Sequence, residues 1–304
     1  MRPLHPPGPE RSAEWRRRFG DEARAERPDL SALCLLVGAQ ADGELDETGM
    51  DAAQIELDRL AGELPFRPGG PRSWATALAE HLGDRCGFRG TPGDYQRLDS
   101  SLLHEVLRRR RGLPILLSVV WMEVARRAGA PVYGVALPGH FVVGFGPPTR
   151  HPTTAPQGAS LSAFFQQQVL VDPFDGGRVL TGPDAELLVA GATGAPLDPS
   201  MLSPADPLDV VLRILNNIRA WAAARPERSD VALWAVELSL LLPSHPARLR
   251  YDRAQLLVER GDFLTGATEL DAYAEVVAAV DEPAADRVRR QARAARAMLN
   301  WRDA

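Results

Sequence analysis

The sequence predicts an α+β fold in which helical regions precede and follow a central domain with a small sheet. Three observations support this class. Apolar residues recur at helical spacing over residues 11–82. Three short segments rich in Val and Phe, bounded by Gly and Pro, fall between residues 132 and 174. Beyond Pro207 no strand pattern remains. We therefore expect a helical N-terminal region (1–84), a central domain (85–200) and a helical C-terminal region (205–304).

Composition excludes several classes of function. The 304 residues carry a net charge of −5, with 45% hydrophobic and 25% charged residues, as in an ordinary globular protein. This balance gives no global attraction to nucleic acid or to an anionic membrane. No segment has the pattern of a signal peptide or a membrane span, so we expect a cytoplasmic protein. All basic residues except histidine are Arg, so no Lys can serve as base or Schiff-base former.

The N-terminal region contains three helical patterns, at residues 30–40, 49–64 and 71–83. In the third, Pro71 is a start signal and Gly83 a stop signal. Between the first two lies ADGELDETG, which faintly resembles a calcium loop. It lacks the spaced ligands and terminal Glu of an EF-hand, so we predict a solvated turn. Cys34, inside the first pattern, is predicted to be a buried, inert thiol.

Two further helices open the central domain. SSLLHEVLRRRRG predicts a helix that ends in Arg108–Arg111 and stops at Gly112, since cations complement the C-terminal dipole. The alternative is that these arginines, Arg111 included, form an anion-binding rim. LPILLSVVWMEVARRAGAP predicts a buried helix with Pro114 in its first turn, where a missing N–H costs nothing.

Strands are predicted at VYGVAL, FVVGFG and QVLVDPF, and the long Pro/Thr/Ser-rich segment before the third suggests a lid or disorder. His140 follows Pro138-Gly139 immediately before the second strand, and Asp172 ends the third. In DPFDGG, Asp175 can cap a turn whose glycines permit positive φ. Such a turn could aim backbone N–H groups at a bound carbonyl, although a simple tight turn is favoured.

Residues past Pro207 form helical patterns separated by Pro and Gly, at the spacing of paired antiparallel helices. YDRAQLLVERGDFLTGATELDAY resembles a tetratricopeptide repeat, with Gly261 at the turn and small Gly266 and Ala267 where helices pack closely. Paired helices of this kind form grooves for peptides or partner helices. We expect a protein or peptide partner there. Candidate groove residues are Arg213, Asn216, Asn217 and Arg219, although a solvated helix face is favoured for them.

The segment from FRGTPGDY through VLVDPFDGGRVL resembles the bacterial SirB-type family, which carries a transglutaminase-like domain followed by tetratricopeptide repeats. The resemblance implies a papain/transglutaminase-like central domain. In that superfamily a Cys at a helix N-terminus is the nucleophile, a His on a following strand is its base, and an Asp orients the His. His140 matches the base and Asp172 the orienting acid.

The residue implied as nucleophile is not a cysteine in this chain. Counting back from Gly129-Ala130-Pro131, the resemblance places the cysteine position at or next to Pro114. Ser118, the first polar residue inside the helix, lies about one turn or 5.4 Å further on and is interpreted as a packing hydroxyl. Cys34 and Cys86 lie outside the motif, and only Cys86, in a predicted loop, could approach the site.

Two functions follow from this pattern. The favoured one is a non-catalytic binding or regulatory module that has lost its nucleophile. The alternative is an active hydrolase or amide-processing enzyme using the His140/Asp172 pair with an unrecognised third group; a purely structural scaffold ranks third. A metal on His140 and Asp172 would need a further ligand. His104, Glu105 and His151 qualify only if the fold brings them close, so we predict neither metal nor cofactor. Binding candidates are Arg111, Gly139, Asp175 and Asn217.

Overall fold

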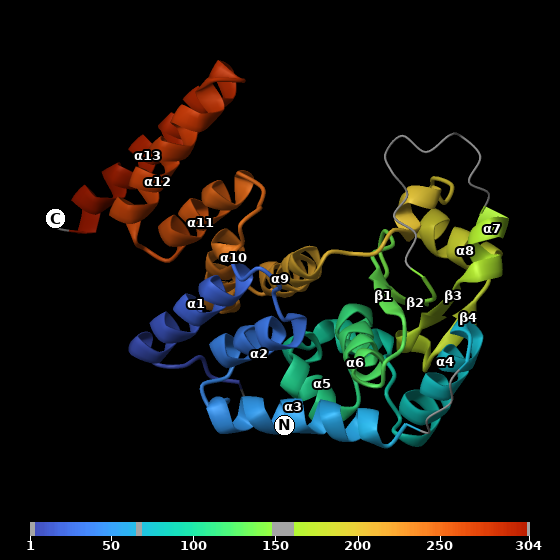
Figure 1. The fold of residues 1–304 in the computed structure, drawn as a ribbon. Coiled ribbons are helices and arrows are strands. Elements are labelled where there is room, and N and C mark those ends of the chain that lie inside the picture. Colours follow the sequence, from blue (N-terminus) through green and yellow to red (C-terminus); the bar gives the residue numbers. More distant parts are fainter. Residues whose placement is uncertain (1–3, 65–68, 148–160, 303–304) are drawn as a thin grey trace. The chain divides into compact units, whose positions relative to one another are not determined.

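A computed structural model describes residues 4–64, 69–147 and 161–302 (Figure 1). The chain divides into two compact units. The first comprises Met1–Trp15 and Arg27–Ile214, and the second comprises Arg16–Glu26 and Leu215–Ala304. Helices dominate and the first unit contains one small antiparallel sheet, which confirms the α+β class. The borders predicted near residues 85 and 205 stay a prediction.

The N-terminal residues form α1 (Pro9–Ala23), α2 (Leu30–Ala41) and α3 (Glu47–Gly62). Asp29 caps α2 and Asp46 caps α3, each carboxylate accepting from a first-turn N–H. The prediction of a solvated turn between α2 and α3 is wrong at two positions: Asp42 is 3% exposed and Leu45 is 6% exposed. The acidic composition predicts exposure, but packing against other helices buries these side chains.

Helix α4 (Pro71–Leu78) starts at Pro71 as predicted and runs directly into a π-helical segment, Ala79–Arg85. Gly83 therefore does not stop the helix. A Cβ there would lie 2.0 Å from the carbonyl oxygen of Gly176, so the missing side chain permits a close backbone approach. This contact places the π-helical segment against the DPFDGG turn.

Helix α5 (Leu103–Arg109) ends earlier than predicted, and Arg110 takes the left-handed conformation (φ 58°) expected of the stop residue Gly112. A Cβ on Gly112 would lie 2.6 Å from Val106, so Gly112 serves close packing instead. Helix α6 (Pro114–Arg127) begins at Pro114 and is buried over nearly its whole length, as the predicted core helix should be.

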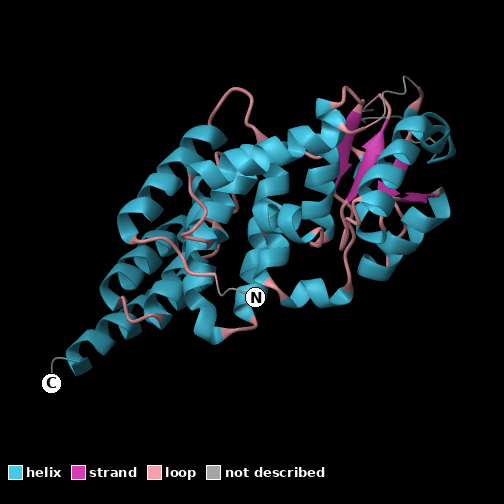
Figure 2. Ribbon diagram, turned by 90° about the horizontal axis from the view of Figure 1, so that it is seen from below, coloured by secondary structure: helices cyan, strands magenta, loops and turns pink. Residues whose placement is uncertain are grey.

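The sheet is drawn in magenta in Figure 2. It has four antiparallel strands in the order β1-β2-β3-β4: β1 (Val132–Val135), β2 (Val142–Phe145), β3 (Val169–Asp172) and β4 (Arg178–Leu180). Pairing Val135 with Val142 and Asp172 with Arg178 makes β1–β2 and β3–β4 hairpins. The first three strands are confirmed. The three-residue β4 was not predicted because it is too short to show alternation.

Helices cover both faces of the sheet. On one face lies α6: a Cβ on Gly134 would be 2.9 Å from Met122, so β1 and α6 approach closely. On the other face lie α7 (Leu161–Gln167) and α8 (Gly182–Thr193), which share a core with the strands. That core includes Tyr133, Val135, Val142, Phe164, Leu170, Leu180, Ala185 and Val189. The sheet is thus packed between helices on both of its faces.

The second unit is all-helical. Helix α9 (Pro207–Ala223) contributes residues to both units, and α10 (Ser229–Leu241), α11 (Arg248–Glu259), α12 (Phe263–Ala278) and α13 (Glu282–Arg302) follow. Gly261 turns between α11 and α12 with φ 87°. A Cβ on Gly266 would lie 2.6 Å from Val258, which confirms the predicted close packing of this helix pair. No helix in the described ranges is both long and apolar enough to cross a membrane.

Candidate active site

His140 and Asp172 meet at the edge of the sheet. Gly139, with φ 72°, lets the chain turn into β2, and the His140 N–H donates to the Leu137 carbonyl (3.1 Å). Asp172 is the last residue of β3. Nε2 of His140 lies 2.9 Å from Oδ2 of Asp172, and the two side chains are 13% and 6% exposed. The fold thus joins two residues that are 32 positions apart.

The turn DPFDGG holds the Asp172 carboxylate. Its Oδ1 accepts from the Phe174 N–H (2.9 Å), while the Gly177 N–H donates to the Asp172 carbonyl (2.8 Å) and the Gly176 N–H to the Pro173 carbonyl (3.2 Å). These three N–H groups are used within the turn, so they do not point at a ligand. Asp175 is exposed and pairs with Arg178 (2.8 Å).

This arrangement orients the imidazole. A carboxylate accepts hydrogen bonds, so Nε2 carries the proton toward Asp172 in the neutral ring and Nδ1 is left with its lone pair. Among the described residues, Nδ1 has no hydrogen-bond partner. This is the arrangement that the family resemblance implies for a base and its orienting acid, and the catalytic role of the two residues stays a prediction.

Two aromatic side chains lie beside the His140–Asp172 pair. The Phe174 ring is perpendicular to the His140 ring at 6.2 Å, and Tyr95 packs edge-on to Phe174 at 6.0 Å. A Cβ on Gly90 would collide with Phe174, so this glycine admits the ring. Partial burial raises the pKa of the Tyr95 phenol, as does the Asp172 carboxylate, while Arg213 acts in the opposite direction. Tyr95 therefore stays a neutral donor near the pair.

Arg213, on α9, holds the backbone of the turn that carries His140. Its Nη2 donates to the Leu137 carbonyl (2.8 Å) and to the His140 carbonyl (2.7 Å), and its guanidinium lies 5.7 Å from the Phe141 ring centre. Burial lowers the pKa of Arg213, although Arg remains charged at any physiological pH. The predicted groove role of Arg213 stays a prediction, and its observed contacts are with the His140 turn.

The start of α6 carries no thiol. Pro114 is the first helical residue, preceded by Leu113 as N-cap. Ser118 is fully buried and its Oγ donates to the Phe141 carbonyl (3.3 Å), as a packing hydroxyl would. Cys34 is buried inside α2, and Cys86 is half-buried after the π-helical segment. Burial raises the pKa of both thiols.

The arginine run at the end of α5 is neutralised by carboxylates. Arg108 pairs with Glu105, Arg109 with Asp94 and Asp99, Arg110 with Glu56, and Arg111 lies 3.9 Å from Asp94. Arg111 is also 3.4 Å from the Thr91 hydroxyl. A binding role for Arg111 stays a prediction.

The remaining predicted residues are dispersed. Asn217 is half-buried on α9, and Arg219 pairs with Asp252 and with Asn216 (3.1 Å). His151 lies outside the described residues. His104 and Glu105 group with Asp42, and no group of three metal-ligand side chains that includes His140 forms among the described residues.

Sequence reasoning missed Tyr95, Phe174 and Arg213 as neighbours of the pair. Phe174 could have been predicted, because it lies two residues after Asp172 in the DPF turn. Tyr95 precedes His140 by 45 positions in the sequence and Arg213 follows it by 73. Neither of these two lies in a pattern that predicts contact with His140, so only the packing of their elements brings them there.

Comparison with known proteins identifies two families and several similar proteins. Residues 51–216 match the transglutaminase-like superfamily, and residues 218–300 match the tetratricopeptide repeat. A UPF0162 protein of Xylella fastidiosa is 30% identical over 253 residues, covering 81% of this chain and 83% of that protein. Human F-box only protein 21 is 27% identical over 177 residues, 58% of this chain and 25% of that protein. A crystal structure of menin aligns over 90% of this chain and 67% of its own at 14% identity, with a TM-score of only 0.41.

The match to the superfamily spans more than half of the chain, and the Xylella relative is similar along most of both chains. The transglutaminase-like match precedes the tetratricopeptide match along the chain, which is the order expected of the SirB-type family. The chain therefore belongs to the UPF0162 family of bacterial proteins, in which a transglutaminase-like domain is followed by tetratricopeptide repeats.

Proposed function

We propose that this protein is a non-catalytic transglutaminase-like module that binds a protein or peptide partner. One observation carries the proposal: the His140–Asp172 pair is intact, while the helix that should present a thiol begins with Pro114. Acyl transfer needs a nucleophile whose proton the imidazole can take. Proline has no such group, and Ser118 uses its hydroxyl on the Phe141 carbonyl.

The two cysteines support the same interpretation. A catalytic thiol has a lowered pKa, from a helix N-terminus or an adjacent imidazolium. Burial raises the pKa of Cys34, with Glu123 and Asp29 acting in the same direction. For Cys86 burial is again the main cause, and the nearby charges come from Arg59, Glu63, Arg85 and Arg110 rather than from His140.

The repeats offer a binding surface of definite chemistry. A cavity of about 290 Å³ in the second unit is lined by Leu240, His245, Arg250, Arg253, Glu269, Ala272 and Tyr273. Arg253 is neutralised by Glu237 and Glu269. Arg250 is exposed and has no ion pair among the described residues. A cavity lined by an exposed guanidinium and a tyrosine favours a partner segment that combines a carboxylate with apolar side chains.

Thiol labelling tests the loss of catalysis. The folded protein and its His140→Ala variant are treated with iodoacetamide, and labelling of Cys34 and Cys86 is followed by mass spectrometry. We expect slow labelling at rates independent of His140. Labelling of either thiol that slows at least tenfold in His140→Ala would favour the alternative, an active hydrolase or amide-processing enzyme.

Partner capture tests the binding role. The full-length protein is cross-linked in its source cells, and the species enriched with it is compared among variants. We expect Arg250→Glu to abolish enrichment and His140→Ala to retain it. Arg260→Glu is the matched control, because Arg260 reaches only the Ser229 hydroxyl (3.0 Å) away from the cavity. Enrichment that survives Arg250→Glu would argue against this cavity as the binding site for the partner.

A further inference from the structure

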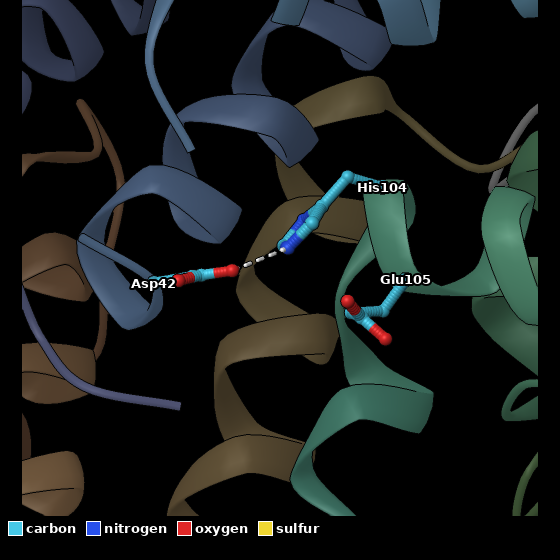
Figure 3. A group of neighbouring side chains, drawn as sticks. All are labelled: Asp42, His104 and Glu105. Atoms are coloured by element: carbon cyan, nitrogen blue, oxygen red, sulfur yellow. Dashed lines mark ion pairs between the residues drawn. The ribbon is translucent and has the colours of Figure 1, made fainter. Parts of the chain in front are cut away.

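A second polar cluster lies apart from the His140 pair, within the first unit. Asp42, at the end of α2, faces His104 and Glu105 at the start of α5 (Figure 3). One ligand atom from each of the three side chains lies within 4.8 Å of the others. All three are largely shielded from solvent, with side chains 5%, 12% and 10% exposed, respectively.

The imidazole of His104 is in an unusual state. Both ring nitrogens are buried and neither has a hydrogen-bond partner. Buried polar atoms are almost always hydrogen-bonded in native proteins, so a ring with two unsatisfied nitrogens requires an explanation. Its separation from Asp42, 3.4 Å between Nε2 and Oδ2, is that of a loose ion pair.

The fold presses this ring against α2. A Cβ on Gly38 would lie 2.6 Å from Nδ1 of His104, so only glycine admits the imidazole here. Gly38 and Asp42 are one helical turn apart, and the Asp42 N–H donates to the Gly38 carbonyl (2.9 Å). One nitrogen therefore faces the helix backbone while the other, Nε2, is directed at the Asp42 carboxylate.

The three side chains lie beside a cavity whose lining is mainly acidic. A cavity of about 440 Å³ is lined by Asp42, Glu44, Asp99 and Glu105, together with His104 and Arg108. Asp99 is neutralised by Arg97 and Arg109. Arg108 holds Glu105, but its side chain is 66% exposed, so an entering cation would compete with a well-solvated guanidinium.

We propose that Asp42, His104 and Glu105 bind a divalent transition-metal cation, for which Zn²⁺ is the appropriate probe. Bonds of about 2.0–2.1 Å to a tetrahedral Zn²⁺ place neighbouring ligand atoms about 3.4 Å apart, which is the spacing of His104 and Asp42. Glu105 completes three protein ligands by turning from Arg108, and the cavity leaves room for water. One imidazole with two carboxylates suits Zn²⁺ or Mn²⁺ better than Ca²⁺ or Mg²⁺, which prefer oxygen alone.

Calorimetric titration of the full-length, metal-free protein with Zn²⁺ tests the site. We expect one Zn²⁺ per chain, weakened at least 100-fold by Asp42→Asn and by His104→Ala. Asp42→Asn is close to isosteric and should keep the native packing. It therefore tests the site even if His104→Ala disturbs the fold. Arg108→Gln should tighten binding, because it frees Glu105 from its competitor. His140→Ala is the control and should leave Zn²⁺ binding unchanged.

Three results would overturn the proposal. The first is equal Zn²⁺ affinity in wild type and Asp42→Asn. The second is loss of Zn²⁺ binding in His140→Ala, and the third is the absence of saturable Zn²⁺ binding. Titration with Ca²⁺ separates a metal-ligand site from a merely acidic cavity. Ca²⁺ binding as tight as that of Zn²⁺ and insensitive to His104→Ala would also contradict the assignment.

Discussion

The guanidinium of Arg213 lies 2.7 Å from the carbonyl oxygen of His140 and 2.8 Å from that of Leu137. One side chain on α9 thus fixes both ends of the turn that carries the imidazole. Arg213 thus holds the backbone of His140, while Asp172 orients its ring. The position of His140 therefore depends on a residue of α9 that lies 73 positions further along the sequence.

Replacing Arg213 should loosen this turn. Arg213→Met keeps an unbranched stem but leaves two carbonyl groups without their charged donor. We expect the free energy of unfolding to fall by about 1.5–3 kcal/mol, the range for hydrogen bonds to a charged group. Urea denaturation measures the loss, and the ¹⁵N spectrum of the His140 ring should shift. Arg219→Met, on the same helix, is the control and should leave that spectrum unchanged.

Gly139 is the second residue on which the turn depends. Its φ of 72° is unfavourable for other residues, and a Cβ would lie 2.7 Å from the Cβ of Ala192 on α8. Gly139→Ala should lower the free energy of unfolding by about 1–3 kcal/mol, the typical cost of such a backbone conformation. Gly191→Ala is a matched control, since a Cβ there meets nothing within 4 Å. Equal stability of the two variants in thermal unfolding would contradict this account of the turn.

His81 should make the fold sensitive to acid. Its ring is buried, with Nε2 2.9 Å from the Leu60 carbonyl, and burial lowers its pKa. The unfolded chain therefore takes up a proton at a higher pH than the folded protein. Stability should fall as the pH drops below about 6.5, the ordinary value for His, and level off below the lowered pKa of the folded state.

Comparing wild type with His81→Gln checks this dependence. The amide can keep a hydrogen bond to Leu60 but does not titrate. Urea midpoints between pH 7.5 and 5 should decline more steeply for wild type than for the variant. Parallel pH profiles would show that His81 is not responsible.

Patterning predicts the main helices and three of the four strands, and the resemblance to the SirB-type family implies the His140–Asp172 contact. Alternating Val residues indicate the strands, and the PGH and DPF sequences indicate the turns beside them. The papain-like order of helix, strand and strand then implies that the two turns lie close together. The helix α8 was missed, although Thr181 and Asp184 form a capping box that marks its start. Burial of Asp42 could not be predicted, because it arises from His104 packing on Gly38 across distant segments.

Installing a thiol tests the central claim, that the site has kept its imidazole–carboxylate pair and lacks only the nucleophile at the start of α6. Pro114→Cys is examined alone and with His140→Ala, and alkylation of each cysteine is followed over pH. The account predicts that Cys introduced at position 114 reacts at least tenfold faster than Cys86, and that His140→Ala removes the advantage. Equal rates with and without His140, or a native cysteine that already depends on His140, would contradict it.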